Sequence, residues 1–248
     1  MTLLSKQLAF IESLVLPDLG RPLLRQSPPG SASASDESAF VAGDSIVSFV
    51  SGLSLQNRED VLNSTLLMQM AADKQFDKAQ QAKQWFKFYT EGLGKLGWTV
   101  SSSALQEYRP AQQSFTLDQV VLEILETVAG ASGFEPVLQR TFNSLRSQPQ
   151  ALQVFQDNST SGSISTFQIM PCSQTDEGDV AMLLNCMQTV KNINTKEILF
   201  FTFKSSDVRI YRSAQMAVLN TNLYSHAREA VIEKLSSSAN NFLARLDI

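Results

Sequence analysis

The spacing of apolar residues predicts a chain that is mainly helical in its first part. In five segments apolar residues recur every three or four positions, which is the period of an amphipathic helix. These predicted helices cover residues 3–15, 54–71, 77–96, 116–129 and 134–148. Ser54 or Asn57 can cap the second helix and Thr116 the fourth, while Gly130 provides a stop.

The pattern changes after residue 163, where segments rich in β-branched and aromatic residues replace the helical period. Four such segments are predicted to form an antiparallel meander with short turns, and they cover residues 164–170, 179–187, 197–203 and 208–218. Shorter strands are expected at 45–53 and 98–100. A last helix is predicted over 221–238, and residues 241–248 either continue it or add a strand.

This order of elements predicts an α+β fold. We expect a helix-rich N-terminal part packed on one face of a C-terminal antiparallel sheet of about four to six strands, in a single domain. Residues 1–25 are predicted to form an amphipathic N-terminal helical arm. Residues 26–38, QSPPGSASASDES, are expected to form a flexible linker or loop because this composition buries little apolar surface, and residues 39–248 are expected to form the α+β domain.

Composition and charge narrow the classes of partner. Hydrophobic residues make up 43% of the 248 residues, enough for a sizeable core. Twenty basic against 24 acidic residues give a net charge of -4, so we expect no nucleic-acid partner. Lys6, Gln7 and Glu12 interrupt the first apolar segment, which predicts a helix without a signal peptide, and no apolar run reaches the length of a membrane span.

The chain offers few ligands for a metal or a cofactor. It has two cysteines, Cys172 and Cys186, and one histidine, His226, and none of them stands in a zinc-binding spacing. Glycine-rich phosphate-binding motifs are absent from the sequence as well. We therefore predict no metal site and no cofactor.

A disulfide between the two cysteines is not expected. If residues 173–178 form the turn between the first two strands of the meander, Cys172 faces position 178 and Cys186 faces Ile164. The two cysteines would then lie more than about 20 Å apart along the ladder, well beyond disulfide range. Cys172 follows Pro171 at a strand end and is expected to be exposed.

Cys186 is the main candidate for chemistry, and three interpretations are open. It shares a strand face with Val180, Met182 and Leu184, so it can be a small buried packing residue. It can also lie beside an apolar groove that holds an acyl chain, either as a thioester or without a covalent bond. Finally, it can form a Cys/His dyad with His226 in an acyltransferase or thioesterase.

The chain resembles the Evf type of bacterial virulence factor in size, in its helix-rich first part and in its sheet-forming second part. The likeness includes a late cysteine in the apolar strand AMLLNCMQTV, ahead of ILFFTF. The resemblance implies a fatty acyl chain, palmitate, linked to Cys186 as a thioester, with Cys172 as the alternative attachment point. It also implies a virulence role.

For the function of the protein, the sequence leaves one main expectation and two alternatives. We expect a non-enzymatic, acylated interaction or virulence protein with peripheral membrane association, whose partners are a membrane surface or acyl chain and a host protein. It would be made in the bacterial cytoplasm, then associate with membrane or reach a host by a non-classical route. The alternatives are a Cys186/His226 acyl-transfer enzyme and an adaptor domain with inert cysteines.

Overall fold

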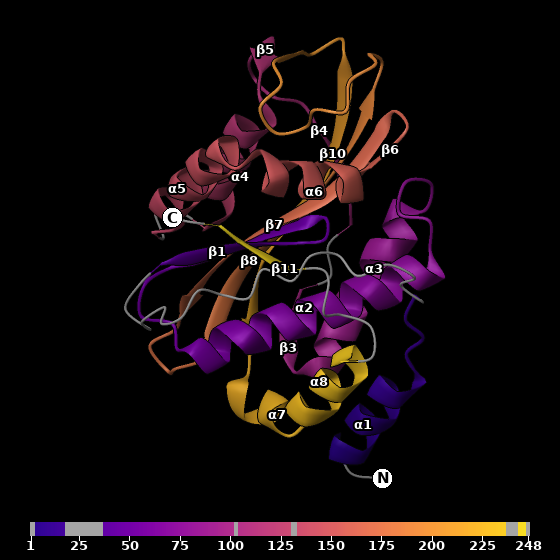
Figure 1. Cartoon of the computed structure of the whole chain (residues 1–248), viewed down its shortest axis with the longest axis vertical. Helices are drawn as coiled ribbons and strands as arrows, with labels where there is room; N and C mark the ends of the chain where they lie inside the picture. The colour runs from indigo at the N-terminus through magenta and orange to yellow at the C-terminus, as the bar shows by residue number, and fades with distance from the viewer. Residues whose placement is uncertain (1–2, 18–36, 102–103, 130–132, 237–242, 247–248) are drawn as a thin grey trace.

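A large mixed sheet runs through the molecule, and helices cover it on both sides (Figure 1). The computed structural model describes residues 3–17, 37–101, 104–129, 133–236 and 243–246. The helices are α1 (Leu3–Ser13), α2 (Leu55–Gln75), α3 (Ala82–Leu96), α4 (Leu117–Ala129), α5 (Phe134–Ser147), α6 (Pro149–Ser159), α7 (Thr221–Ser225) and α8 (Arg228–Ser236). The strands are β1 (Ser38–Ala42), β2 (Ser45–Phe49), β3 (Trp98–Val100), β4 (Gln106–Tyr108), β5 (Ser114–Phe115), β6 (Thr160–Ser161), β7 (Ile164–Gln174), β8 (Val180–Lys191), β9 (Phe203–Lys204), β10 (Val208–Leu219) and β11 (Leu243–Leu246).

The sheet has the order β11-β1-β2-β7-β8-β10-β3, with β4 also paired to β10 and β6 to β7. The long strands β7, β8 and β10 form an antiparallel centre, whereas β2 runs parallel to β7. The predicted α+β class and single domain are confirmed. The described part of the sheet contains nine strands, more than predicted, because the hairpin of β1 and β2 and the short strand β11 extend it on one side.

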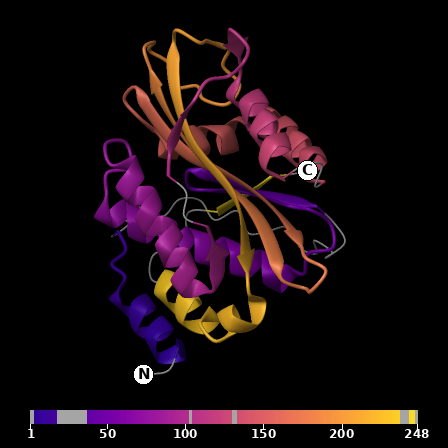
Figure 2. The same ribbon diagram turned by 180° about the vertical axis from the view of Figure 1, so that it is seen from behind.

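Helices lie on both faces of the sheet (Figure 2), and among the described residues two separate apolar clusters form the core, one on each face. Helices α1, α2, α3 and α8 cover one face, and α4, α5 and α6 cover the other. Successive residues of β8 alternate between them: Met182, Leu184 and Cys186 face α2 and α3, while Leu183 and Met187 face α4 to α6. The expectation that helices cover a single face is therefore wrong.

Capping hydrogen bonds fix the start of α2 and the turn that follows this helix. The Ser54 hydroxyl accepts a hydrogen bond from the Asn57 amide at 3.1 Å, so Ser54 caps α2 as one of the two predicted choices. Asp77 caps the turn after α2, where its carboxylate accepts a hydrogen bond from the Ala79 amide at 2.9 Å. The structure thus places a compact turn between α2 and α3, and the start of α3 five residues later than predicted.

One predicted strand is wrong. Residues 197–203 are an extended loop apart from Phe203, which pairs through β9 with β5 in a separate two-stranded sheet. Ile198 and Leu199 are buried in the cluster under α4 to α6, and the Leu199 carbonyl accepts a hydrogen bond from the Asp118 amide at 3.2 Å. The apolar residues of this segment therefore reflect a loop that packs into the core. Because the segment adds no strand to the central sheet, β8 pairs directly with β10.

The chain ends follow the sequence expectations in part. Helix α1 packs on α3 and α8, and its Ile11 has no exposed surface. The predicted linker at 26–38 falls outside the described residues up to position 36, and β1 begins at Ser38. β11 pairs with β1, so the strand alternative for the C-terminal segment is confirmed. No described helix has both the length and the apolar character needed to cross a bilayer.

Candidate functional site

Both cysteines lie on the face of the sheet that α2 and α3 cover, and neither has exposed surface. Cys186 pairs with Gln168 across β7 and β8, and Cys172 pairs with Met182, so the predicted register is wrong by four positions. The expected exposure of Cys172 is also wrong. Both thiols are free, which confirms that no disulfide joins them.

The surroundings of both thiols favour the neutral, unreactive form. Burial raises the pKa of Cys172 and of Cys186 well above the ordinary value for a thiol. At Cys186 the negative charge of Asp44 raises the pKa further, and the positive charge of Lys78 opposes this only in part. Cys186 is therefore a poor nucleophile in this structure.

We expect both thiols to react with iodoacetamide at least about a hundredfold more slowly in the native protein than in denaturant, because alkylation needs an accessible thiolate. Mass spectrometry of quenched samples gives the rates. The variants Cys172→Ser and Cys186→Ser report each remaining thiol separately. Fast labelling of Cys186 in the native protein would show that its cover opens readily.

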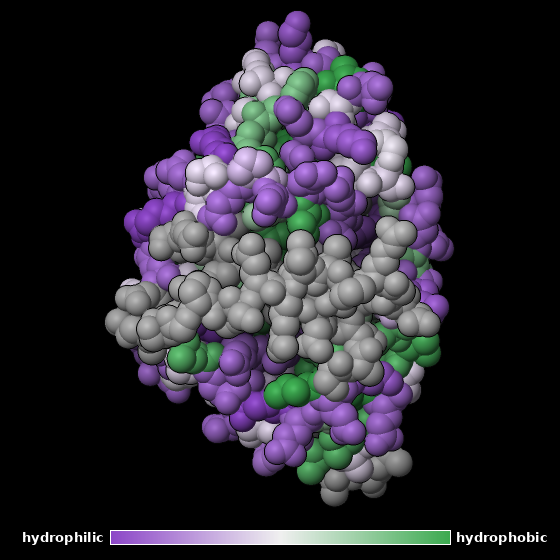
Figure 3. Space-filling view, viewed as in Figure 1, coloured by the Kyte–Doolittle hydropathy of each residue, from purple (hydrophilic) through white to green (hydrophobic). Residues whose placement is uncertain are grey.

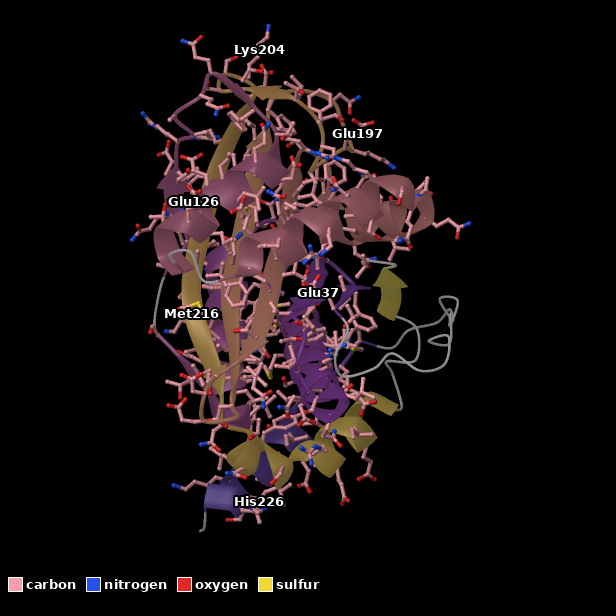
Figure 4. All side chains as sticks on the ribbon, turned by 90° about the vertical axis from the view of Figure 1, so that its left-hand side faces the viewer. Glu37, Glu126, Glu197, Lys204, Met216 and His226 are labelled. Atoms are coloured by element: carbon pink, nitrogen blue, oxygen red, sulfur yellow. The ribbon has the colours of Figure 1, made fainter. Side chains whose placement is uncertain are left out.

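His226 lies far from the position that a dyad with Cys186 requires. Its side chain is exposed at the C-terminal end of α7, and Figure 4 places it at the lower end of the molecule. Cys186, in contrast, lies inside the central sheet with no exposed surface. The structure does not bring the two side chains together.

A row of polar residues crosses the sheet at the level of Cys186. Ser45 in β2 pairs with Gln168 in β7, Gln168 pairs with Cys186 in β8, and Cys186 pairs with Ser213 in β10. All four side chains are buried. Neither polar atom of the Gln168 side chain has a hydrogen-bond partner in the part of the chain that the structure describes.

Three charged residues that the sequence analysis did not single out meet beside this row. Lys78, in the turn between α2 and α3, donates a hydrogen bond to Asp44, which ends the β1–β2 turn. The Lys78 Nζ also lies 3.9 Å from Oδ1 of Asp73 in α2. The Asp44 side chain is 1% exposed, the Lys78 side chain 20% and the Asp73 side chain 32%. We call Asp44, Lys78 and Asp73 the charged triad.

Burial changes the proton affinity of Asp73. It raises the pKa of Asp73 to about 6, although the charge of Lys78 and a 2.8 Å hydrogen bond from the Trp85 indole oppose the shift. Asp73 therefore exchanges protons near neutral pH, as a proton carrier does. Two carboxylates and one ammonium do not form a metal site, and no group of three potential metal ligands lies together in the described ranges.

A cavity of about 610 Å³ lies between α1, α3 and α7. Its lining residues are Lys6, Gln7, Ala9, Phe10, Gly94, Lys95 and Leu223. The Gln7 side chain is 4% exposed, and neither of its polar atoms has a partner among the described residues. Lys95 Nζ lies 4.4 Å from the ring centre of Phe10. We call this cavity the α1–α3–α7 pocket.

Comparisons with known proteins give likeness at the level of the fold only. No family model matches the sequence, and no curated protein matches it. A solved delta-endotoxin is similar with a TM-score of 0.41 and 15% identity over 83% of this chain and 90% of the other. The structure of the Evf virulence factor is similar with a TM-score of 0.37 and 12% identity over 79% and 82%. TM-scores this low assign no residue and no activity.

Proposed function

We propose that this protein is a non-enzymatic binding protein for amphiphiles that join an acyl chain to a negatively charged head group. The observation that carries this proposal is the α1–α3–α7 pocket, whose volume falls in the range of small-molecule sites. Its walls supply apolar contact from Phe10 and Leu223, while Lys6 and Lys95 supply positive charge. This combination matches a fatty acid.

The pocket also supplies a polar group for recognition of the ligand head. Buried amides almost always have hydrogen-bond partners, and an unpartnered one is energetically unfavourable. The amide of Gln7 lacks a partner among the described residues, yet it lines the pocket. The Gln7 amide has almost no exposed surface, so it would have to turn into the pocket to donate to a carboxylate that the two lysines hold. The acyl chain gains about 0.8 kcal/mol per buried CH₂.

The surface near the pocket supports a peripheral association with membranes. Leu4 in α1 is 40% exposed, Val15 just after α1 is 64% exposed, and Ile232 in α8 is 44% exposed. In Figure 3 apolar surface lies among polar surface at the lower end of the molecule, where Figure 1 places α1 and α8. Apolar residues beside lysines favour a bilayer with anionic lipids.

Filling the pocket is the direct test of the binding site. An added Cβ at Gly94 meets no atom within 4 Å, so Gly94→Leu has room inside the cavity and also improves helix propensity. We expect the variant to fold and to bind palmitate at least about tenfold more weakly, measured by calorimetry. Unchanged affinity, or no measurable binding of palmitate by the wild type, would overturn the proposal.

Charge recognition is tested by a matched pair of variants on α3. Lys95→Glu is expected to weaken binding of palmitate while leaving binding of uncharged hexadecanol nearly unchanged, because only palmitate carries the head-group charge. Lys83 lies on the same helix but does not line the pocket, so Lys83→Glu is the control. Flotation with anionic and neutral vesicles then shows whether the same charges act at a membrane surface.

Acylation of Cys186 is a second proposal, favoured by its own observation. Cys186 faces the larger apolar cluster, which could hold an acyl chain, and the positive charge of Lys78 offsets in part the burial and the Asp44 charge that raise the pKa of the thiol. Attack of the thiolate on an acyl thioester would form the Cys186 thioester and release the donor thiol. Because Cys186 has no exposed surface, attachment would have to precede closure of the α2–α3 turn over it.

Intact-mass measurement of the purified protein tests this second proposal. An added acyl mass that hydroxylamine removes, and that is absent in Cys186→Ser but present in Cys172→Ser, would support it. An unmodified mass in protein purified from its native source would overturn it. The virulence role and a host-protein partner stay predictions from the family resemblance.

A further inference from the structure

The charged triad brings an amine, a carboxyl group and a proton carrier together from two parts of the chain, the β1–β2 turn and the end of α2 with the turn after it. We propose that Lys78 and Asp44 condense to an intramolecular isopeptide bond, with Asp73 carrying the proton. Lys78 and Asp44 are already in direct contact, and Asp73 lies 3.9 Å from the same amine. The bond would join the β1–β2 turn to the α2–α3 turn, and it is independent of the amphiphile proposal.

The structure holds both reacting groups by their backbones. The Lys78 carbonyl accepts hydrogen bonds from the side chains of Thr166 at 3.3 Å and Gln188 at 3.4 Å, both on the central sheet. The backbone carbonyl of Asp44 accepts a hydrogen bond from the backbone N–H of Gln168 at 3.1 Å. Fixing two reactants in contact replaces a collision in solution by an intramolecular step, which lowers the entropic part of the barrier.

The reaction balances without any further reactant. The ammonium of Lys78 first passes one proton to Oδ2 of Asp44, which gives a neutral amine and a carboxylic acid. The Nζ lone pair then forms a bond to Cγ of Asp44. A second Nζ proton passes through the Asp73 carboxylate to the departing oxygen, the Cγ–O bond breaks, and water leaves. The third proton remains on the amide nitrogen.

The surroundings support each part of this step. Burial favours the neutral amine, although the two carboxylates outweigh it and raise the pKa of Lys78 in the ion pair. Proton transfer within the pair avoids release of that proton to solvent. Asp73, with its pKa raised to about 6, both accepts and returns a proton near neutral pH. Because Asp44 is 1% exposed, water has little access to hydrolyse the product.

Mass spectrometry of the full chain tests the bond. We expect the intact mass to be lower than the sequence mass by one water. Trypsin should then give a branched peptide that joins residues 26–58, which contain Asp44, to residues 75–83, in which Lys78 escapes cleavage. An acyl chain adds mass, so the two modifications are distinguished directly. A sequence-derived mass together with cleavage after Lys78 would overturn the proposal.

Three variants assign the roles. Lys78→Arg keeps the positive charge and Asp73→Asn keeps an acceptor for the Trp85 indole, and we expect both to retain the full sequence mass. Glu91→Gln, at an exposed position on α3, should still lose water. Lys78→Arg should also unfold at a temperature lower by on the order of 10 °C, because the link closes a loop of 34 residues. Loss of water in Asp73→Asn would remove Asp73 from the mechanism.

Discussion

Arg228→Ala is expected to lower the free energy of unfolding by about 3–5 kcal/mol, which is a large part of the stability of an ordinary domain. Arg228 at the start of α8 donates two hydrogen bonds to Asp60 in α2, from Nε at 2.8 Å and from a terminal nitrogen at 2.7 Å. The Asp60 side chain has no exposed surface. Removing the guanidinium therefore leaves a buried carboxylate without its counter-charge.

The same pair allows two informative controls, measured by urea denaturation with intrinsic fluorescence. The double variant Asp60→Leu/Arg228→Leu removes both charges and should recover most of the loss, because the unfavourable element is the unpaired buried charge. Arg109→Ala breaks an ion pair with Glu107 in which the Arg109 side chain is 85% exposed, and should change the stability by less than about 1 kcal/mol. An equally small effect of Arg228→Ala would contradict this account.

The salt bridge also explains how the C-terminal helices join the N-terminal half of the molecule. Sequence periodicity predicted one helix over 221–238, whereas the structure has α7 and then α8, which begins at Arg228. The Asn220 side chain accepts a hydrogen bond from the Leu223 amide at 2.8 Å and caps α7. The chain turns after Ser225, and this turn brings Arg228 to Asp60. Because Asp60 lies 168 residues away in the sequence, the local spacing of apolar residues could not predict the break between the two helices.

The fold was predictable where the signal is local, and less so where it depends on distant partners. Alternation along β8 placed Cys186 on the same face as Met182 and Leu184, and the structure agrees. The pairing register of β7 with β8 differs from the predicted one because β7 continues to Gln174, so the turn between the two strands lies later in the chain than predicted. Gly178 in this turn has a φ of 89°, in the left-handed region. The parallel pairing of β2 with β7 has no local signal at all.

The candidate site shows the same limit more strongly. Cys186 attracted attention because a cysteine is rare in this chain, yet its neighbours Asp44 and Lys78 looked like ordinary polar turn residues. Asp44 follows a glycine, and Lys78 stands in the polar stretch DKQFDKAQQAK. Only the packing of the α2–α3 turn onto the sheet brings them together, so the triad is a tertiary feature. The α1–α3–α7 pocket depends on tertiary packing in the same way, because α7 follows α3 by more than a hundred residues.

Phe167→Ala is expected to be as damaging as loss of the buried ion pair, for a different physical reason. Phe167 has no exposed surface and lies in β7, on the face covered by α4 to α6. Its ring packs edge-on against Phe155 of α6 with 5.6 Å between ring centres. Deleting such a side chain removes apolar burial and leaves a cavity, which together lower the free energy of unfolding by about 3–5 kcal/mol.

Graded variants separate the cavity from other effects. Phe167→Leu keeps most of the volume and should lose less than half as much stability as Phe167→Ala. Phe201→Ala, in the half-buried loop before β9, should lose about 1 kcal/mol because partial burial leaves less contact to remove. If urea denaturation shows the same loss of stability for all three variants, the core around Phe167 is not densely packed. Helix α6, which was not predicted from the sequence, packs on the sheet through the contact of Phe155 with Phe167. If the helical circular dichroism signal of Phe167→Ala falls at low urea, the contact between α6 and the sheet is the part that the substitution weakens.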